Sequence, residues 1–452
     1  MKEFTDQYIE EMRDIICRHD EAAARAELEQ MHPADIAELY QELDLEEAEF
    51  LYNLLDEDTR ADVLMELDEE DRRKLLSNMP AKEIATQVID HLDTDEAVDL
   101  IQELDEDDRD EILSHINDVE QAGDIIDLLK YDEDTAGGLM GTEMIVVNEN
   151  WSMPECIKQM RMQAEDMDEI YYVYVVDNDD RLKGILPLKT LITHPSVSKI
   201  KHIMECEPVS VKTDTPIDDV ALDFEKYDLV AMPVVDSIGR LVGRITVDDV
   251  MDQVRESSER DYQLASGLSS DVDASDSILA QTKARIPWLL IGIVSGILAS
   301  LILTGFEAQL QAVTTLAIFI PIIGGTGGNV GVQASAIVVQ GLANGTLDIK
   351  EFAKQLWKEV RVGLLNATII SGVIFVYNLI MIPHDFAVTL SVAVSLFIVV
   401  MFATLLGTIV PLTLEKLKIN PALATGPFIQ ISNDIVGLVI YVFISTWFLS
   451  IF

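Results

Sequence analysis

One carboxylate lies deep inside the most apolar part of the chain. Asp434 is the single charge in the run from Ile419 to Phe452. Placing a carboxylate in hydrocarbon is costly, so such a group usually lines a polar pathway or meets a partner. One interpretation is a structural carboxylate bonded to a neighbouring span. The other apolar runs carry no cation, however, and a cation moving along a pathway would supply the missing partner.

Glycines interrupt the second apolar run at residues 324–329, which read GGTGGN. This run lacks the Lys and Ser/Thr of a phosphate-binding P-loop. Within a membrane, glycines either let two backbones approach closely or line an aqueous path with carbonyl groups. Asn329 and Gln333 share one helical face, and both could hydrogen-bond hydrated ions. We therefore expect these two side chains to line a pore.

Three further residues break the start of the last apolar run. Pro421, Gly426 and Pro427 lie shortly before Asp434 and could expose backbone carbonyls, so Gly426 and Pro427 are also predicted to line the pore. An oxygen-only site with few carboxylates suits Mg²⁺, which loses its water reluctantly. The chemistry indicates a hard cation. Co²⁺ or Mn²⁺ remains an alternative, because one ring of carboxylates discriminates poorly.

The formal charge of −48 is divided very unevenly along the 452 residues. Residues 1–282 carry −49 and residues 283–452 carry +1. So dense a negative field repels nucleic acid and attracts cations, and we expect no nucleic-acid partner. The alternative is a surface charged only for solubility, because charge runs are usually solvated. The scattered cysteines, Cys17, Cys156 and Cys206, show no metal-ligand spacing and suit a reducing cytosol.

The elements that must position Asp434 are membrane spans. Uncharged runs of this length predict spans rather than buried helices of a soluble core. They are Ile286–Gly305, Ala308–Leu347, Val362–Pro383, Phe386–Leu414 and, apart from its one carboxylate, Ile419–Phe452.

The second run has 40 residues and could hold one span or two. The positive-inside rule separates these possibilities, because basic residues gather on the cytosolic side. Five spans place every basic group on one side, with residues 1–282 in the cytosol and Phe452 outside. The basic groups are Lys283, Arg285, Lys350, Lys354, Lys358, Arg361, Lys416 and Lys418. We therefore predict a five-helix transmembrane domain over residues 283–452 in the plasma membrane.

A short apolar-plus-turn signal recurs through the first 130 residues at intervals of 12, once 13. The Asp, Pro or Asn at each junction suits a helix N-cap or first turn. The junctions are at His32-Pro33, Asp44, Asp56, Asp68, Pro80, Asp93, Asp105 and Asn117. Units this short cannot bury a face alone, so neighbours must stack. The prediction is an all-α helical-repeat domain over residues 1–136.

A second repeat follows. Val175-Val176-Asp177 and Arg181-Leu182 return 59 residues later as Val234-Val235-Asp236 and Arg240-Leu241. Each copy predicts a strand, a polar turn, another strand and the start of a helix. The pattern resembles a tandem pair of cystathionine-β-synthase (CBS) domains, which we assign to residues 137–200 and 201–255. A connecting helix and linker over 256–282 would join this α/β pair to the membrane domain.

The CBS resemblance raises the question of an adenosine nucleotide such as ATP. Residues 243–249 match the family's G-h-h-T-x-x-D pattern only in part, since Arg244 replaces an apolar residue. Thr246 and Asp249 would be the nucleotide ligands of this copy. The alternative is a capped helix start, with Thr246 as the N-cap.

Taken together, the order of parts resembles the MgtE family of Mg²⁺ channels over essentially the whole chain. The residues that carry the resemblance are GGTGGN and the NPALATGPF…ND segment of the last span. The resemblance implies a homodimer with its pore on the two-fold axis and Asp434 as the selectivity site for hydrated Mg²⁺. It also implies that cytosolic Mg²⁺ binds between acidic domains and holds the pore shut.

The resemblance further implies a set of regulatory acids. These are Asp95, Asp99, Asp218, Asp228, Asp249, Asp252, Glu256 and Glu259. Three positions depart from the family's pattern. Asn420 stands where an acid can occur, Pro216 replaces an acid, and residues 430–432 read QIS where small hydroxyl residues are expected.

The resulting prediction is a Mg²⁺-gated Mg²⁺ channel for magnesium uptake and homeostasis. A secondary transporter of an organic solute, gated by the CBS pair, is the alternative from another class. Such transporters commonly show inverted repeats, and none is visible among five spans. An enzyme is disfavoured, because the spans show no acid–base pair and no nucleophile triad.

Overall fold

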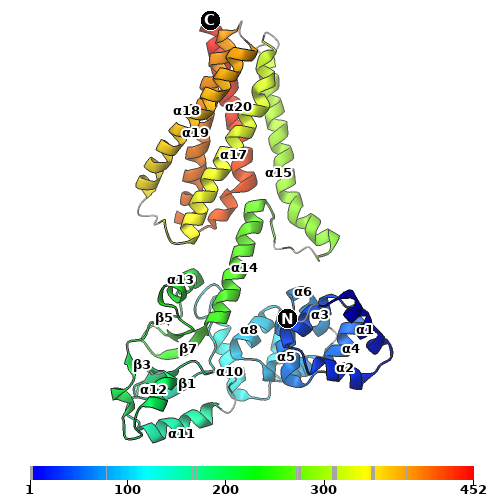
Figure 1. The fold of residues 1–452 in the computed structure, drawn as a ribbon, viewed down its shortest axis with the longest axis vertical. Helices are drawn as coiled ribbons and strands as arrows, with labels where there is room; N and C mark the ends of the chain where they lie inside the picture. The colour runs from blue at the N-terminus through cyan, green and yellow to red at the C-terminus, as the bar shows by residue number, and fades with distance from the viewer. Residues whose placement is uncertain are drawn as a thin grey trace. The chain divides into compact units, whose positions relative to one another are not determined.

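The computed structural model describes residues 4–451 except 78, 165–166, 168–169, 271, 273–275, 308–312, 348–351 and 383–384. The chain divides into two compact units, Met1–Val254 and Arg255–Phe452. Each unit is described by itself, and Figure 1 labels their elements.

The first unit begins with short helices at the predicted interval. They are α1 (Asp6–Cys17), α2 (Glu21–Leu28), α3 (Pro33–Gln41), α4 (Leu45–Tyr52), α5 (Glu57–Met65), α6 (Glu69–Leu76), α7 (Ala81–Gln87), the 3₁₀ helix η1 (Ile89–His91), α8 (Thr94–Gln102), α9 (Glu106–Leu113) and α10 (Val119–Leu128). The expected caps are confirmed at Asp44, Asp56 and Asp68, whose side chains accept a hydrogen bond from a first-turn amide. The last junction differs by one residue, because Asp118 rather than Asn117 caps α10.

Stacking of these helices gives each one an apolar neighbour. Leu39, Leu64 and Ile101 are fully buried in one continuous core. The same core includes Met232 and Ile245 from the second CBS copy. The helical repeat and the second CBS copy therefore pack on each other through apolar side chains.

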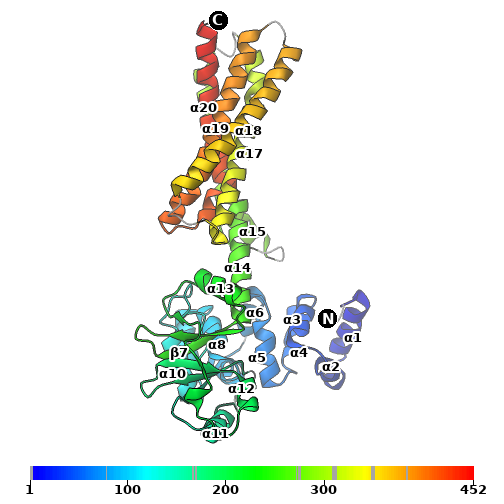
Figure 2. The same cartoon turned by 60° about the vertical axis from the view of Figure 1, so that its left-hand side comes forward.

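The CBS pair follows, and its two copies form two sheets. The first copy contains β1 (Ile145–Asn148), α11 (Met153–Gln163), β2 (Val173–Val176), β3 (Leu182–Leu186), α12 (Leu188–Thr193), η3 (Ile200–His202) and β4 (Glu205–Cys206). The second contains β5 (Val211–Lys212), α13 (Ile217–Tyr227), β6 (Ala231–Val235) and β7 (Leu241–Thr246). The strand orders are β1-β2-β3-β4 and β5-β6-β7, and Figure 2 labels β7 and the helices α11, α12 and α13 of the pair.

The internal repeat is confirmed at the level of strand register. Val175 lies opposite Gly184 in the first copy, and Val234 lies opposite Gly243 in the second. Both antiparallel pairs have an irregularity after this position. Arg181 and Arg240 also form an antiparallel bridge, so the equivalent turns of the two copies meet.

The membrane half consists of long apolar helices. They are α15 (Ile278–Gly305), α17 (Thr315–Ala343), α18 (Phe352–Met381), α19 (Phe386–Lys416) and α20 (Gly426–Ile451), with the 3₁₀ helix η5 (Pro421–Ala424) before the last. Among the described residues, five helices are long and apolar enough to cross a membrane. The five-span prediction is thus confirmed, and the described part of the long second run contains one such helix, α17.

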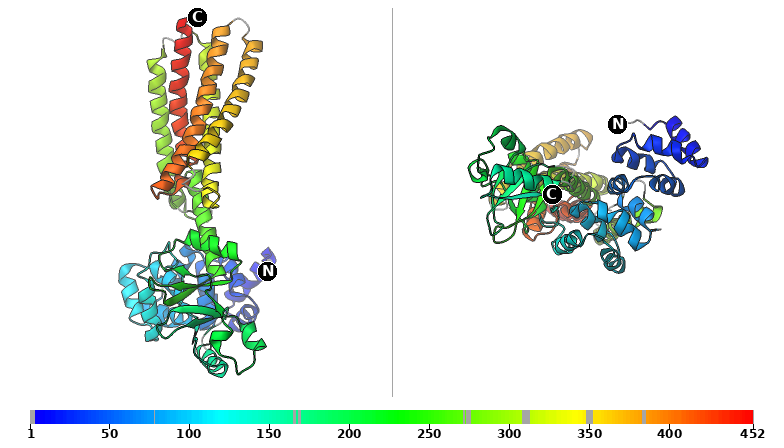
Figure 3. Two further views of the ribbon diagram at one scale, coloured as in Figure 1. Left: turned by 90° about the vertical axis from the view of Figure 1, so that its left-hand side faces the viewer. Right: turned by 90° about the horizontal axis from the view of Figure 1, so that it is seen from below.

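Packing in this half centres on α19. It contacts α17, α18 and α20, and Figure 3 shows the helices running side by side. Leu396, Val399 and Tyr441 are buried in their common core. By contrast, the apolar part of α15 is largely exposed in the single chain, as expected of a helix that faces lipid or another protein surface.

Candidate functional site

Asp434 lies in α20 against the glycine-rich face of α17. A Cβ built on Gly324 would lie 3.3 Å from Oδ1 of Asp434, and one built on Gly328 would lie 3.7 Å from it. The GGTGGN segment lies within helix α17 and is not a loop. Its glycines let α17 approach the half-buried carboxylate closely. Close approach was one of the two roles that the sequence left open, and lining an aqueous path was the other.

Asn433, the residue before Asp434, has an unusual environment that sequence reasoning missed. Its side chain is buried, and neither amide atom has a hydrogen-bond partner among the described residues. A Cβ on Gly331 would clash with this amide, so the side chain packs directly on the backbone of α17. Buried polar groups are normally satisfied, and an unpaired amide marks a site that water or a ligand can complete.

Asn329 and Gln333 are exposed on α17. Polar side chains on a membrane helix avoid hydrocarbon by facing a pathway or another protein surface. Gly426 begins α20 with a φ of +46°, and Pro427 follows it. The nearby carbonyl of Ala422 accepts hydrogen bonds from both the hydroxyl and the amide of Thr425, and that of Ala424 accepts one from the Ser335 hydroxyl.

The start of the last span also contacts the helix α14 (Val247–Ser266). Asn420 Nδ2 donates a hydrogen bond of 2.7 Å to Asp261 Oδ1. A Cβ on Gly426 would overlap the carbonyl of Ala265, and one on Gly267 would lie 2.5 Å from Pro427. The end of α14 and the start of α20 are therefore in direct contact. A larger residue at Gly426 or Gly267 would force the neighbouring atoms to move.

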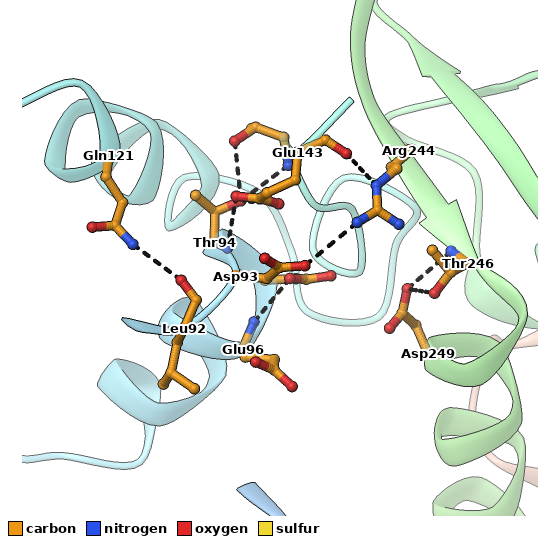
Figure 4. Close-up of polar contacts among 11 residues, drawn as sticks. Leu92, Asp93, Thr94, Glu96, Gln121, Glu143, Arg244, Thr246 and Asp249 are labelled. Carbon is orange, nitrogen blue, oxygen red and sulfur yellow. Dashed lines mark hydrogen bonds and ion pairs between the residues drawn. The ribbon is translucent and has the colours of Figure 1, made fainter. Parts of the chain in front are cut away.

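A cluster of acids forms a second candidate site in the first unit. One carboxylate oxygen from each of Asp93, Asp95 and Glu143 lies within 4.8 Å of the others, close enough to share a cation. Figure 4 shows Asp93 and Glu143 around the first turn of α8, with Arg244 and Asp249 approaching from the second CBS copy. Carboxylate oxygens are the ligands that Mg²⁺ prefers.

Burial and mutual repulsion disfavour the charged forms of these acids. Burial raises the pKa of Asp95 well above its usual range, and the charges of Asp249 and Glu143 raise it further. Burial, with the charge of Asp93, raises the pKa of Glu96 to about 7. Burial also raises the pKa of Asp249, although hydrogen bonds from Thr246 oppose that rise. A divalent cation would relieve this repulsion.

The predicted regulatory acids are only partly brought together. Asp95 belongs to the Asp93–Asp95–Glu143 trio, and the charge of Asp249 raises the pKa of both Asp95 and Asp99. Asp218, Asp228 and Asp252 are exposed, and none of them belongs to the Asp93–Asp95–Glu143 trio.

The last two predicted acids lie on α14 and have basic partners. Glu256 pairs with Arg260 at 2.6 Å, and Glu259 pairs with Arg255 at 3.1 Å. Both pairs join residues one turn apart on an exposed helix, where such ion pairs contribute little to stability. A divalent cation could therefore displace them at small cost.

Sequence reasoning missed Asp93 and Glu143 as site residues, because their proximity depends on the domain contact. Glu359 was not considered either, because it lies before the uncharged run Val362–Pro383. Helix α18 begins at Phe352, so Glu359 lies within it, buried and accepting a hydrogen bond of 3.3 Å from Gln355. Asp434 is therefore not alone as a carboxylate buried in the membrane helices.

The nucleotide prediction at Thr246 and Asp249 meets a competing contact. Asp249 Oδ2 accepts hydrogen bonds from the Thr246 backbone amide at 2.9 Å and from its hydroxyl at 2.5 Å. These bonds are one half of a capping box, in which the N3 carboxylate accepts from the residue before the helix. A separate pocket lies nearby, and Tyr171, Tyr172 and Arg244 contribute to its lining.

Models of known families match three parts of the chain. Residues 31–134 match the MgtE intracellular N domain, residues 136–196 and 200–256 match the CBS domain, and residues 320–444 match the divalent cation transporter model of MgtE. The helical repeat, the strand pair and the helices around Asp434 thus each correspond to a known module.

Similar proteins include magnesium transporters from two bacteria. The magnesium transporter MgtE of Thermus thermophilus is 39% identical over 313 residues, which are 69% of each chain. The Bacillus subtilis transporter is 31% identical over 319 residues, 71% of this chain and 70% of that one.

Solved structures resemble the cytosolic part. The soluble part of a magnesium transporter is 30% identical, with a TM-score of 0.50, and the match covers 55% of this chain and 98% of that one. The cytosolic domain of the Mg²⁺ channel MgtE in complex with ATP is 34% identical, with a TM-score of 0.51, covering 54% and 98%.

Proposed function

Because this chain belongs to the MgtE family of magnesium transporters, we propose that it is a Mg²⁺-selective channel gated by cytosolic Mg²⁺, which serves magnesium uptake and homeostasis. The observation that carries this proposal is the position of Asp434. Its carboxylate faces the bare backbone of Gly324 and Gly328 in the membrane half. A hydrated divalent cation held there would balance its charge.

A second copy of the chain would complete the pore. Asn329 and Gln333 are exposed polar groups on α17, the same helix that bears the glycines beside Asp434. In a homodimer with the pore on the two-fold axis, two Asp434 carboxylates would bind one ion through its water shell. The exposed amides would then face water rather than lipid.

Gating would begin at the acid cluster. Asp95 and Asp249 belong to different domains, and their charges disfavour each other. Cytosolic Mg²⁺ would neutralise them and hold the helical repeat on the second CBS copy. The contact of Asp261 on α14 with Asn420 supplies a path from the sensor to the pore entry. We place this contact in the closed state.

We also propose that the CBS pair binds ATP in the pocket lined by Tyr171, Tyr172 and Arg244 rather than at Thr246 and Asp249. Aromatic rings can stack on a base, and a guanidinium can bind phosphate. Tyr172→Ala should weaken ATP binding to the purified protein about tenfold, the effect of losing one base-stacking ring. Asp249→Asn should leave ATP affinity within about twofold, since its contacts to Thr246 need no charge. Isothermal titration compares the two, and the reverse order would contradict this placement.

The proposed location is the plasma membrane, with residues 1–282 inside and the C-terminus outside. A Lys354→Cys variant in a cysteine-free background should resist an impermeant thiol reagent in intact cells, because the positive-inside rule places this residue in the cytosol. Glu307→Cys should react from outside and serves as the matched control. Labelling of Lys354→Cys from outside would contradict the orientation. Lys350, which the sequence also predicts to lie in a cytosolic loop, is outside the described residues.

Transport of Co²⁺ or Mn²⁺ is the competing function, because carboxylate and amide oxygens accept these ions too. Flux into proteoliposomes with Mg²⁺, Ca²⁺, Co²⁺ and Na⁺, compared side by side, decides between them. The Mg²⁺ proposal requires that Mg²⁺ flux exceed the others at equal concentration.

A further inference from the structure

Three junction acids of the helical repeat cap the helix that follows them, whereas Asp93 and Asp105 make no such side-chain bond. Asp44, Asp56 and Asp68 each accept a hydrogen bond from the amide three residues on, at 2.9, 3.1 and 2.9 Å. Asp93 occupies the same position before α8, but its side chain makes no such bond. The amide three residues on, that of Glu96, instead donates a hydrogen bond of 3.1 Å to Asp95 Oδ1.

The first turn of α8 is satisfied instead from outside the repeat. Glu143 Oε1 accepts a hydrogen bond of 3.0 Å from the amide of Thr94, and Thr94 Oγ1 accepts one of 3.0 Å from the amide of Thr142. These bonds exist only while the repeat lies against the segment that contains Glu143. They therefore report docking of the two parts.

Arg244 of β7 meets the carboxylate of Asp93. Its Nη2 lies 3.4 Å from Asp93 Oδ2, and its Nε donates to the backbone carbonyl of Glu143. The Arg244 backbone exchanges two hydrogen bonds of 2.9 Å with Gly141, and its guanidinium lies 5.8 Å from the centre of the Tyr171 ring. With only 12% of its side chain exposed, the guanidinium is held in a fixed position.

This position adds a permanent positive charge to an otherwise acidic contact. Asp93, Asp95 and Glu143 form the trio that could share a cation, and Asp249 adds its charge beside Asp95. A guanidinium that donates to one carboxylate and to an adjacent carbonyl offsets part of their repulsion. Unlike a bound ion, it is present at every Mg²⁺ concentration.

We propose that Arg244 is a tethered counter-ion that takes the place of part of the divalent charge at this contact and so lowers the Mg²⁺ concentration at which the helical repeat docks. The inference rests on the proposed Mg²⁺ sensor and adds a residue that sets its threshold. Arg244 acts through Asp93 and the docking contact, so it is a positioning residue and not an ion ligand.

The test is hydrogen exchange of the first turn of α8 in the full-length protein, in chelator at fixed ionic strength. In Arg244→Met the amide of Thr94 should exchange about tenfold faster than in the unchanged protein, the effect of one charge-assisted hydrogen bond. Arg244→Lys should keep most of the protection, because it keeps the charge. Arg240→Met is the matched control, since Arg240 pairs with Asp236 on an exposed turn.

Millimolar Mg²⁺ should return Arg244→Met to the protection of the unchanged protein, because added ions replace the lost charge. If Arg244 served only to pack the contact, the Thr94 amide of Arg244→Met would stay unprotected even with Mg²⁺. The proposal would be overturned if the Thr94 amide exchanged equally fast in Arg244→Met and in the unchanged protein in chelator. It would also be overturned if Arg240→Met lost as much protection of this amide as Arg244→Met. Failure of Mg²⁺ to protect the unchanged protein more than NaCl would instead count against the sensor itself, so the two failures are distinguishable.

Discussion

Asp434→Ala should lower Mg²⁺ flux into proteoliposomes at least about a hundredfold, because two carboxylates of a dimer would otherwise face each permeating ion. The charge is the important feature. Asp434→Asn keeps hydrogen-bonding atoms of the same size, yet it should lose most of the flux too. Asp434→Glu keeps the charge but lengthens the side chain against Gly324 and Gly328, and it should retain partial flux.

A matched control separates loss of charge at the pore from loss of folding. Asp385 caps α19 by accepting a hydrogen bond of 3.1 Å from Val388. Asn is also a good cap, so Asp385→Asn removes one carboxylate from the membrane half without disturbing the helix end. It should conduct normally. Mg²⁺ flux in a dimeric, well-folded Asp434→Ala protein that equals this control would sink the assignment of the pore.

The features that could be predicted from the sequence are local or repeated. An N-cap depends on residues within one turn, so Asp44, Asp56 and Asp68 could be placed from spacing alone. The strand register of the CBS pair follows from the 59-residue repeat, since equivalent residues have equivalent partners. Long uncharged runs and the side on which basic residues gather gave the five spans.

Contacts between distant parts of the chain could not be predicted in this way. Glu143 satisfies Thr94, 49 positions away, and Arg244 meets Asp93 from 151 positions away. No motif or regular spacing links the two members of either pair, so only their residue types were known from the sequence. Arg244 was visible as a departure from the CBS pattern, and that departure was the available clue. The first turns of α18 are charged and precede the uncharged run Val362–Pro383, so a search for uncharged runs did not reach Glu359.

The sensor should respond to divalent cations and not to ionic strength alone. Cleavage of the 255–285 segment of the full-length protein by a protease should be slower in millimolar Mg²⁺ than in NaCl of equal ionic strength. The reason is that Asp95 and Asp249 lie on different domains, and burial together with their mutual repulsion disfavours their charged forms. A divalent cation between the two carboxylates would neutralise their repulsion, whereas monovalent salt only screens it.

Neutralising the cluster should remove the requirement for the ion. In Asp95→Asn/Asp249→Asn, protection in chelator should rise toward the level that the unchanged protein reaches in Mg²⁺. The matched control is Glu29→Gln/Glu38→Gln, which removes two charges from exposed positions of the same helical repeat. It should keep the Mg²⁺ dependence. Equal protection of the unchanged protein in Mg²⁺ and in NaCl would leave a surface charged only for solubility as the better explanation.

One variant can separate sensing from its transmission to the pore. Asn420→Ala removes the hydrogen bond to Asp261 and the cap that Asn420 Oδ1 provides to the Ala422 amide, but it leaves the acid cluster intact. Its Mg²⁺-dependent protection should therefore match that of the unchanged protein. Channel closing in proteoliposomes should need at least about tenfold more Mg²⁺, since the hydrogen bond to the charged Asp261 is lost. Asn420→Asp would place two carboxylates together, so closing should then require a cation between them. A channel that closes more readily in Asn420→Ala would show that the contact belongs to the open state instead.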